Sequence, residues 1–234
     1  MKKTAFKILA LLFAALLCYS ASRVWGIARD YGAEAEIHAL ALEYRPLPED
    51  PANQTVINLQ KKYPDVAGWL TIPGTDIDYP FVWYKDNDYY LRRDLNGSYA
   101  LAGTLFLDCR CEKDFTARNT IVYGHHMKNG SMFGTLKAFA DEDFFAAHTR
   151  GAICLPRKTL GLEFFAYLVV DHNDREIYTA SLSEDYLAYV RRSARRYRDI
   201  GLTGADRIVT LSTCSYEFNN ARMVLLAKVV PPAS

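Results

Sequence analysis

The chain has 234 residues, 50% of them hydrophobic and 24% charged, so it can bury one compact core, and general disorder is excluded. Lys and Arg total 28 against 27 Asp and Glu, and a net charge of +1 argues against broad nucleic-acid binding. The one basic run, Arg191 to Arg198, is predicted to be the solvated face of an amphipathic helix.

The first 28 residues predict a membrane segment. Three lysines, at positions 2, 3 and 7, precede an uncharged apolar run from Ile8 to Ser22, and this run alone makes a helix of about 22 Å against a hydrocarbon layer of roughly 30 Å. Snorkelling by Lys7 and Arg23 extends it to 24 residues, Ala5 to Ala28, which is enough to span. The positive-inside rule then leaves the N-terminus in the cytoplasm and exports the rest of the chain.

A cleaved signal peptide is the alternative, because Ser20 and Ser22 are small enough for a peptidase site. Apolar character continues through Trp25 and Ile27, which favours a retained anchor. We therefore expect residues 1–28 to be a signal-anchor, residues 29–65 to be a helical segment with a linker, and residues 66–234 to be one domain.

The rest of the chain contains many short strands and few helices. Apolar spacing predicts a helix from Ile27 to Tyr44, prolines in the stretch 46–54 predict a linker, and a short helix ends at Tyr63. Eight strands follow, at 69–72, 77–82, 103–107, 119–123, 151–155, 162–171, 208–214 and 222–229.

Two helices interrupt the strands. One is predicted from Ser131 to His148, and the other opens with Ser181 and Glu184 in capping-box spacing and ends at Gly201, before the last two strands. This pattern predicts a mainly β fold, a closed or nearly closed barrel decorated by helices.

We do not expect the five cysteines to form a disulfide framework, because their number is odd and they are few for a chain of this length. Cys109 and Cys111 share a face if extended, but a zinc site needs about four ligands and no second pair has suitable spacing. We therefore predict no metal and no cofactor, and expect Cys109, Cys111 and Cys154 to be buried structural thiols.

A thiol and a guanidinium lie at the mouth of the last predicted hairpin. Alternation along residues 208–214 places Cys214 on the face opposite Val209 and Leu211, and the returning strand can bring Arg222 beside it. A neighbouring cation favours a thiolate and can stabilise an oxyanion on a carbonyl that the thiolate attacks. A buried structural cysteine is the alternative.

Catalysis by a thiol also needs a group that moves protons, and His suits this near neutral pH. His125 and His126 follow an apolar strand and Gly124, and in extended backbone they point to opposite sides, so at most one meets Cys214. The other candidates are His38, His148 and His172, and spacing alone does not choose among the five.

Two motifs resemble the signature of the sortases, and specifically of class B sortases. They are TLSTC at 210–214, with Arg222 on the following strand, and YGHHMKNGSMFG at 123–134. The resemblance covers roughly Val66 to Val229. It implies an eight-stranded sortase-type β-barrel with N-terminal helices and a helix before the last two strands, so that residues 66–234 are the catalytic domain.

Carried over residue by residue, the resemblance implies Cys214 as the nucleophile, His125 as the acid and base, and Arg222 as the group that orients substrate and stabilises the oxyanion. Ser212, Thr213 and Tyr216 are expected to contact the substrate. Some class B members carry Asp two residues after the cysteine, and Tyr216 stands there in this chain, so a catalytic carboxylate at that position is absent.

The implied function is a cysteine transpeptidase at the outer face of a Gram-positive-type membrane. It would cleave a C-terminal sorting motif of secreted proteins after threonine, through a thioacyl enzyme, and transfer the product to an amine of peptidoglycan or its precursor. The alternatives are a hydrolytic thiol peptidase of the same fold and a non-catalytic, membrane-anchored binding module.

Overall fold

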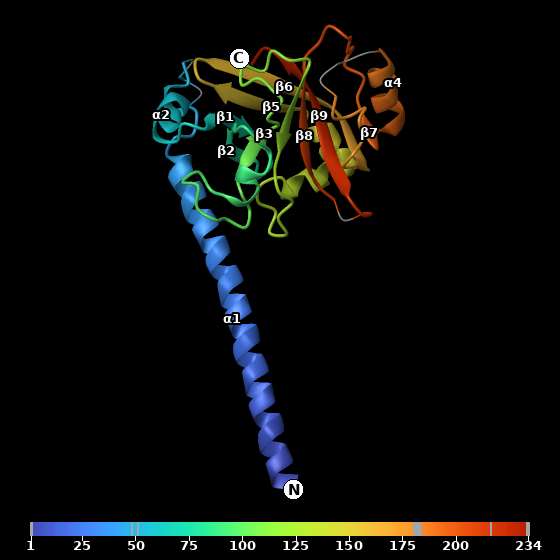
Figure 1. The fold of residues 1–234 in the computed structure, drawn as a ribbon. Coiled ribbons are helices and arrows are strands. Elements are labelled where there is room, and N and C mark those ends of the chain that lie inside the picture. Colours follow the sequence, from blue (N-terminus) through green and yellow to red (C-terminus); the bar gives the residue numbers. More distant parts are fainter. Residues whose placement is uncertain (1, 48, 51, 180–183, 216, 233–234) are drawn as a thin grey trace.

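The computed structural model describes residues 2–47, 49–50, 52–179, 184–215 and 217–232. Figure 1 shows a barrel of strands from which one long helix, α1 (Lys2–Leu42), projects, while the short helix α2 (Gln54–Lys62) packs beside the barrel where α1 ends. The barrel and the two N-terminal helices are the main features of the molecule.

Eight strands form a closed ring. They pair in the order β5-β1-β2-β3-β4-β8-β9-β6, and β6 pairs back onto β5. The prediction of an eight-stranded barrel is confirmed, with the strands at β1 (Val66–Thr71), β2 (Asp78–Val82), β3 (Leu105–Leu107), β4 (Asn119–Tyr123), β5 (Arg150–Leu155), β6 (Lys158–Asp171), β8 (Ile208–Cys214) and β9 (Ala221–Val230). A two-residue strand, β7 (Arg196–Tyr197), pairs with β6 outside the ring.

The interior of the ring is one apolar core. A single cluster takes buried side chains from all eight ring strands, as alternation in a closed barrel requires. Its members include Leu70, Phe81, Leu105, Val122, Ile153, Phe164, Leu211 and Leu225. Because alternate residues fill this core, the remaining residues of each strand face outward, where a site can form.

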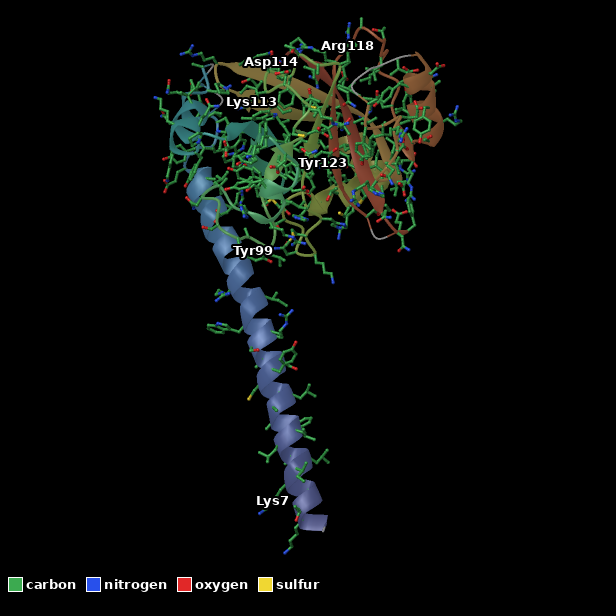
Figure 2. All side chains as sticks on the ribbon, viewed as in Figure 1. Lys7, Tyr99, Lys113, Asp114, Arg118 and Tyr123 are labelled. Carbon is green, nitrogen blue, oxygen red and sulfur yellow. The ribbon has the colours of Figure 1, made fainter. Side chains whose placement is uncertain are left out.

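Strand directions place three chain segments at one end of the barrel. The strands β2 and β3 run parallel, β3 and β4 antiparallel, and β4 and β8 parallel. The first residues of β2 and the last residues of β4 and β8 therefore lie at the same end. In Figure 2, Arg118, just before β4, lies on the side away from α1, and Tyr123, which ends β4, lies nearer to it.

The helix α1 is seated at that same end. The His38 ring stacks on Tyr79 with centroids 4.3 Å apart, and His38 Nε2–H donates to the Asp78 carbonyl over 3.1 Å. Arg45, just after α1, pairs with the Asp78 carboxylate at 2.8 Å. Ring stacking stabilises a contact by about 0.5–1.5 kcal/mol and a half-exposed ion pair by about 0–1 kcal/mol. The stacking of His38 on Tyr79 therefore contributes more to the free energy that holds α1 against the barrel than the Arg45–Asp78 pair does.

The N-terminal part of α1 is long and apolar enough to cross a membrane. The segment Phe6–Arg29 has 24 residues and a mean hydropathy of 1.8, and none of it is buried against the rest of the chain. Figure 2 shows this part of the helix extending away from the barrel with side chains on both sides of it, and Lys7 lies near the free end. A signal sequence has the same properties, so both interpretations of this segment remain open.

The predicted helix from Ser131 to His148 is wrong as one element. The structure has a 3₁₀ helix, η2 (Gly134–Ala140), followed by α3 (Glu142–Ala147). Asp141 separates them, because its extended backbone breaks the first helix and its side chain accepts a hydrogen bond from Phe144 N at 2.9 Å, which caps the second.

The predicted helix that ends at Gly201 is also too long. The structure has α4 (Glu184–Ser193), while Ser181 of the predicted capping box lies outside the described residues. After Ser193 the backbone turns to β6, where Arg195 N donates to Tyr167 O and Arg198 N donates to Phe165 O. The basic run 191–198 is therefore only partly helical. A helix before the last two strands is confirmed.

Candidate active site

Alternate side chains of strand β8 point to its two faces, so that core residues lie on one face and site residues on the other. Val209 and Leu211 belong to the interior cluster. Ser212 Oγ instead bonds the hydroxyl of Tyr178 outside the ring over 2.8 Å. Cys214 ends the strand on this outer face and is partly exposed, as a thiol that must meet substrate requires.

Arg222 lies directly opposite Cys214. The two residues are the last register pair between β8 and β9, which are antiparallel. The Arg222 side chain is partly buried and donates one hydrogen bond to the Ala221 carbonyl, over 3.2 Å. The register therefore places Arg222 across from Cys214 next to the loop that joins β8 to β9, and both residues line the same pocket.

A groove of about 390 Å³ lies against this pair. It is lined by residues from β3, the ends of β4 and β8, the start of β9, the 3₁₀ helix η1 (Tyr89–Arg92) and the loops that follow β2, β4 and β6. The lining residues are Asn87, Leu91, Phe106, Tyr123, Gly124, His125, His172, Tyr178, Ser212, Thr213, Cys214 and Arg222. The structure thus brings the thiol, an imidazole and the guanidinium to one concave surface.

His125 reaches the groove because Gly124 allows β4 to end close to the core. A Cβ at Gly124 would overlap the Leu105 side chain and come within 2.8 Å of the Phe133 ring. His125 Nε2–H donates to the Leu91 carbonyl over 2.6 Å. Burial lowers the pKa of His125 below its ordinary value and the positive charge of Arg92 adds to this, while the bond to Leu91 opposes the shift.

The other histidines have different surroundings. His126 Nδ1–H donates to the backbone carbonyl of Cys214, and His172 lines the groove while its Nδ1 lies 3.3 Å from the Asp171 carboxylate. His38 packs under α1, and the His148 ring stacks on Phe144. Two imidazoles therefore border the groove, those of His125 and His172.

The three predicted substrate contacts have different positions. Ser212 and Thr213 both line the groove. Thr213 is 2% exposed, and its hydroxyl has no hydrogen-bond partner in the part of the chain that the structure describes. Tyr216 lies outside the described residues.

An aromatic wall that the sequence reasoning missed completes the groove. The Tyr123 ring lies 5.4 Å from Phe106 and 6.3 Å from Tyr178, between ring centroids. Burial raises the pKa of Tyr178 to about 12, so its hydroxyl keeps its proton at neutral pH. Tyr123 precedes the Gly-His pair in the quoted motif, which was a usable signal. Asn87 and Tyr178 lie in loops and Leu91 lies in the 3₁₀ helix η1, and none of these has such a signal.

The arrangement suits covalent chemistry by a thiol. Each of the five cysteines is a free thiol. Among the residues that the structure describes, no group of three or more His, Cys, Asp or Glu side chains is placed to hold a metal ion. A thiol with an imidazole and a guanidinium along one groove can attack a carbonyl, move a proton and stabilise the resulting oxyanion.

Comparisons with known proteins agree with this chemistry. The family model of the sortase domain matches residues 70–230. Sortase B of Listeria monocytogenes is 39% identical over 179 residues, which cover 74% of this chain and 73% of that protein. The X-ray structure of a mutant form of Clostridium perfringens sortase B superposes with a TM-score of 0.76 at 33% identity, covering 82% of this chain and 96% of that one. A Staphylococcus aureus sortase B-substrate complex gives a TM-score of 0.79 at 26% identity, covering 88% of this chain and 100% of that one.

Proposed function

The chain belongs to the sortase family, as a class B cysteine transpeptidase, and on this premise we propose that Cys214, His125 and Arg222 are its catalytic residues. The observation that carries the proposal is that all three line one groove. Cys214 ends β8, Arg222 lies at the start of β9 and His125 follows the end of β4, so each is attached to a strand of the closed barrel.

The first half-reaction makes a thioester. The Cys214 thiolate attacks the carbonyl carbon of a threonine in the sorting motif, and the oxyanion that develops lies beside the Arg222 guanidinium. The bond from that carbon to the next nitrogen breaks, and protonated His125 gives its proton to the leaving amine. The N-terminal part of the substrate stays on Cys214 as a thioacyl group.

The second half-reaction releases the product. An amine of peptidoglycan or its precursor attacks the thioester, neutral His125 takes the proton from that amine, and the carbon–sulfur bond breaks to return the thiolate. The secreted protein then carries a new amide bond to the cell wall. His125 ends protonated, as it began, so the cycle closes.

Substrate recognition is proposed to use the residues just before and after the nucleophile. Ser212 and Thr213 border the groove, and Tyr216 completes the predicted set. We propose a C-terminal sorting motif that contains a proline and a threonine as the ligand. Secreted proteins that bear this motif, and peptidoglycan as the acceptor, are then the partners.

The location follows from the N-terminal helix. We propose that Phe6–Arg29 is retained as a single-pass anchor in the cell membrane, since its length suits the bilayer and lysines precede it. The N-terminus is then cytoplasmic and the barrel extracellular, where both substrates are available. Cleavage of this segment would instead release the barrel.

A single assay tests the reaction. The full-length enzyme in detergent is incubated with a panel of sorting peptides, with and without an amine acceptor, and the products are identified by mass. We expect cleavage after threonine, an amide product when the amine is present and an acyl mass on Cys214 that Cys214→Ala abolishes. Release of free acid only, at any amine concentration, would favour hydrolysis, and no acyl mass in the wild type would favour a binding module.

A further inference from the structure

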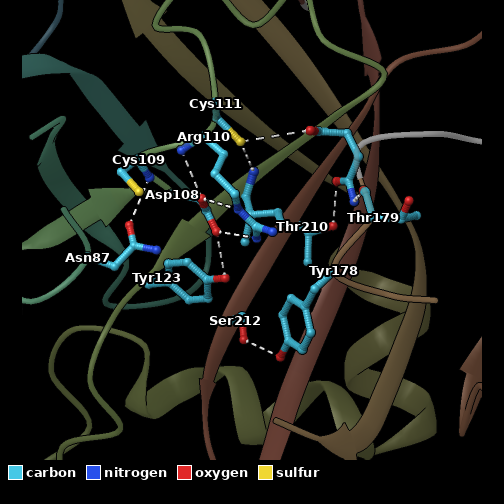
Figure 3. Close-up of polar contacts among 12 residues, drawn as sticks. Asn87, Asp108, Cys109, Arg110, Cys111, Tyr123, Tyr178, Thr179, Thr210 and Ser212 are labelled. Carbon is cyan, nitrogen blue, oxygen red and sulfur yellow. Dashed lines mark hydrogen bonds and ion pairs between the residues drawn. The ribbon is translucent and has the colours of Figure 1, made fainter. Parts of the chain in front are cut away.

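A buried carboxylate lies behind the groove wall. Asp108 follows β3 and is completely buried. Figure 3 shows its contacts: the Arg110 side chain donates to both carboxylate oxygens, over 2.8 Å and 2.7 Å, and Arg110 N donates over 2.9 Å. Burial alone would favour a neutral acid, but these bonds hold the pKa of Asp108 below its ordinary value.

The remaining contact of this carboxylate reaches the groove. The Tyr123 hydroxyl donates to Asp108 Oδ2 over 3.0 Å (Figure 3). Tyr123 is also one of the residues that line the groove. A ring held only by packing can slide along its neighbours. Here Asp108 holds the hydroxyl at the far end of the Tyr123 ring. Both the plane of the ring and its position in the groove wall are therefore fixed.

The turn that carries Asp108 fixes a second lining residue. Cys109 N donates to the Asn87 side-chain oxygen over 2.8 Å, and Asn87 belongs to the groove lining. Cys111 N closes the turn on the Asp108 carbonyl over 2.8 Å. One turn therefore holds two lining residues, one through a carboxylate and one through a backbone N–H.

Tyr123 connects this turn to the strand that ends in Cys214. The Tyr123 ring contacts Tyr178, whose hydroxyl bonds Ser212 Oγ. Tyr123 also lies two residues before His125, with only Gly124 between them, and Gly124 N donates to the Ser212 carbonyl over 3.2 Å. A displaced Tyr123 ring would therefore reshape the wall on which a peptide must lie.

We propose that Asp108 is a positioning residue, which holds the Tyr123 ring in the orientation that the sorting peptide meets. The inference rests on the proposed function, because it concerns the same groove. Asp108 touches neither substrate nor the reacting atoms and acts through Tyr123. A purely structural carboxylate would stabilise its turn without affecting peptide binding, and this difference can be measured.

The variant Tyr123→Phe tests the proposal, since it removes one hydroxyl and leaves the Asp108–Arg110 pair intact. A matched control exists: the hydroxyl of buried Tyr90 donates to the Asp65 carboxylate over 2.7 Å, and neither of these residues lines the groove, although the next residue, Leu91, does. We expect Tyr123→Phe to raise KM for the sorting peptide about fivefold to tenfold, because a ring that is no longer held by Asp108 makes a poorer wall for the peptide, with kcat within about twofold. Tyr90→Phe should lower stability similarly and leave KM within about twofold.

Two further measurements separate the outcomes. Peptide affinity is compared in a Cys214→Ala background, where binding does not depend on turnover, and we expect the same fivefold to tenfold loss from Tyr123→Phe. The second is the rate at which iodoacetamide alkylates Cys214, which should not change. Asp108→Asn, which keeps the size of the side chain and loses its charge, should weaken peptide binding at least as much as Tyr123→Phe.

Equal KM and affinity for Tyr123→Phe and Tyr90→Phe would overturn the positioning role, and so would full peptide affinity in folded Asp108→Asn. Wild-type enzyme that binds peptide but forms no product would instead refute the proposed reaction, while the affinity comparison would still decide the role of Asp108. Failure of the groove to bind any sorting peptide would refute both.

Discussion

His126 Nδ1–H donates to the backbone carbonyl of Cys214 over 3.0 Å, so the second histidine of the pair contacts the main chain of that residue. His125, one residue earlier, points into the groove instead and is held there by the Leu91 carbonyl. The side chains of these two adjacent histidines thus point to opposite sides of the chain at the end of β4, as alternation requires.

This relationship predicts unequal effects of the two histidines. His125→Ala should lower kcat/KM by about 100-fold or more, because it removes the proposed acid and base. His126→Ala removes one hydrogen bond to a carbonyl and should cost less than about tenfold. Steady-state cleavage of a sorting peptide by the two variants checks this. Equal losses would defeat the assignment, and His172→Ala, at the other groove imidazole, should retain activity near that of the wild type.

Arg222→Lys should be severely impaired. The guanidinium is a planar fork that can donate to an oxyanion and to the substrate together, and an ammonium is a point charge without that geometry. We expect kcat to fall by about 100-fold, the cost of removing one oxyanion donor. The kinetics of thioacyl formation on Cys214, followed by mass, measure the step itself. Wild-type turnover by Arg222→Lys would rule out the oxyanion role.

Gly124→Ala should destabilise the barrel and disturb His125. The added methyl group would overlap Leu105 and press on the Phe133 ring, and overpacking of a core costs about 1–3 kcal/mol. Thermal unfolding and peptide cleavage report the two effects. Gly32→Ala is the control, because nothing lies within 4 Å of its added Cβ. An unchanged melting temperature for Gly124→Ala would show that the strand end can move aside.

Stability should fall as pH is lowered from 7 to 5, in part through His125. Burial lowers the pKa of His125 in the folded chain, so below about 6.5 the unfolded chain binds a proton that the folded chain does not. Protonation therefore favours unfolding. His126 contributes in the same direction. His125→Gln should lose less stability than wild type over this range, as measured by melting temperature at pH 7 and pH 5, and an identical loss would contradict the linkage.

Much of the fold could be predicted because its strands are short, apolar and separated by turn residues. Strand β8 is a good example, since the alternation of Val209 and Leu211 with Ser212 and Cys214 marks both its faces. The first and last residues of the helices were harder to predict. Asp141 looks like an ordinary polar residue in a helix, and only its extended backbone in the fold makes it a cap.

The site could be predicted where residues lie on paired strands or in a motif. Cys214 and Arg222 could be paired from a hairpin register, whereas His125 was chosen only through the resemblance of the motif at 123–134. Leu91 and Tyr178 could not be found in this way, because a short 3₁₀ helix and a loop bring them to the groove from distant parts of the chain. Asp108 was also missed, because a carboxylate beside an arginine in a turn looks like a solvated surface pair until burial is known.

The contacts of α1 with the barrel fix the height of the groove above the proposed membrane segment. From Arg29 to Leu42 the helix rises only about 20 Å, and α1 meets the barrel at the end where the groove lies. With α1 kept as an anchor, inserting two residues there would raise the barrel by about 3 Å, and inserting seven would raise it by about 10 Å. A single anchoring helix can rotate freely in the plane of the membrane, so the added height is the change that the groove experiences, and wall anchoring in cells should fall more after the longer insertion than after the shorter one.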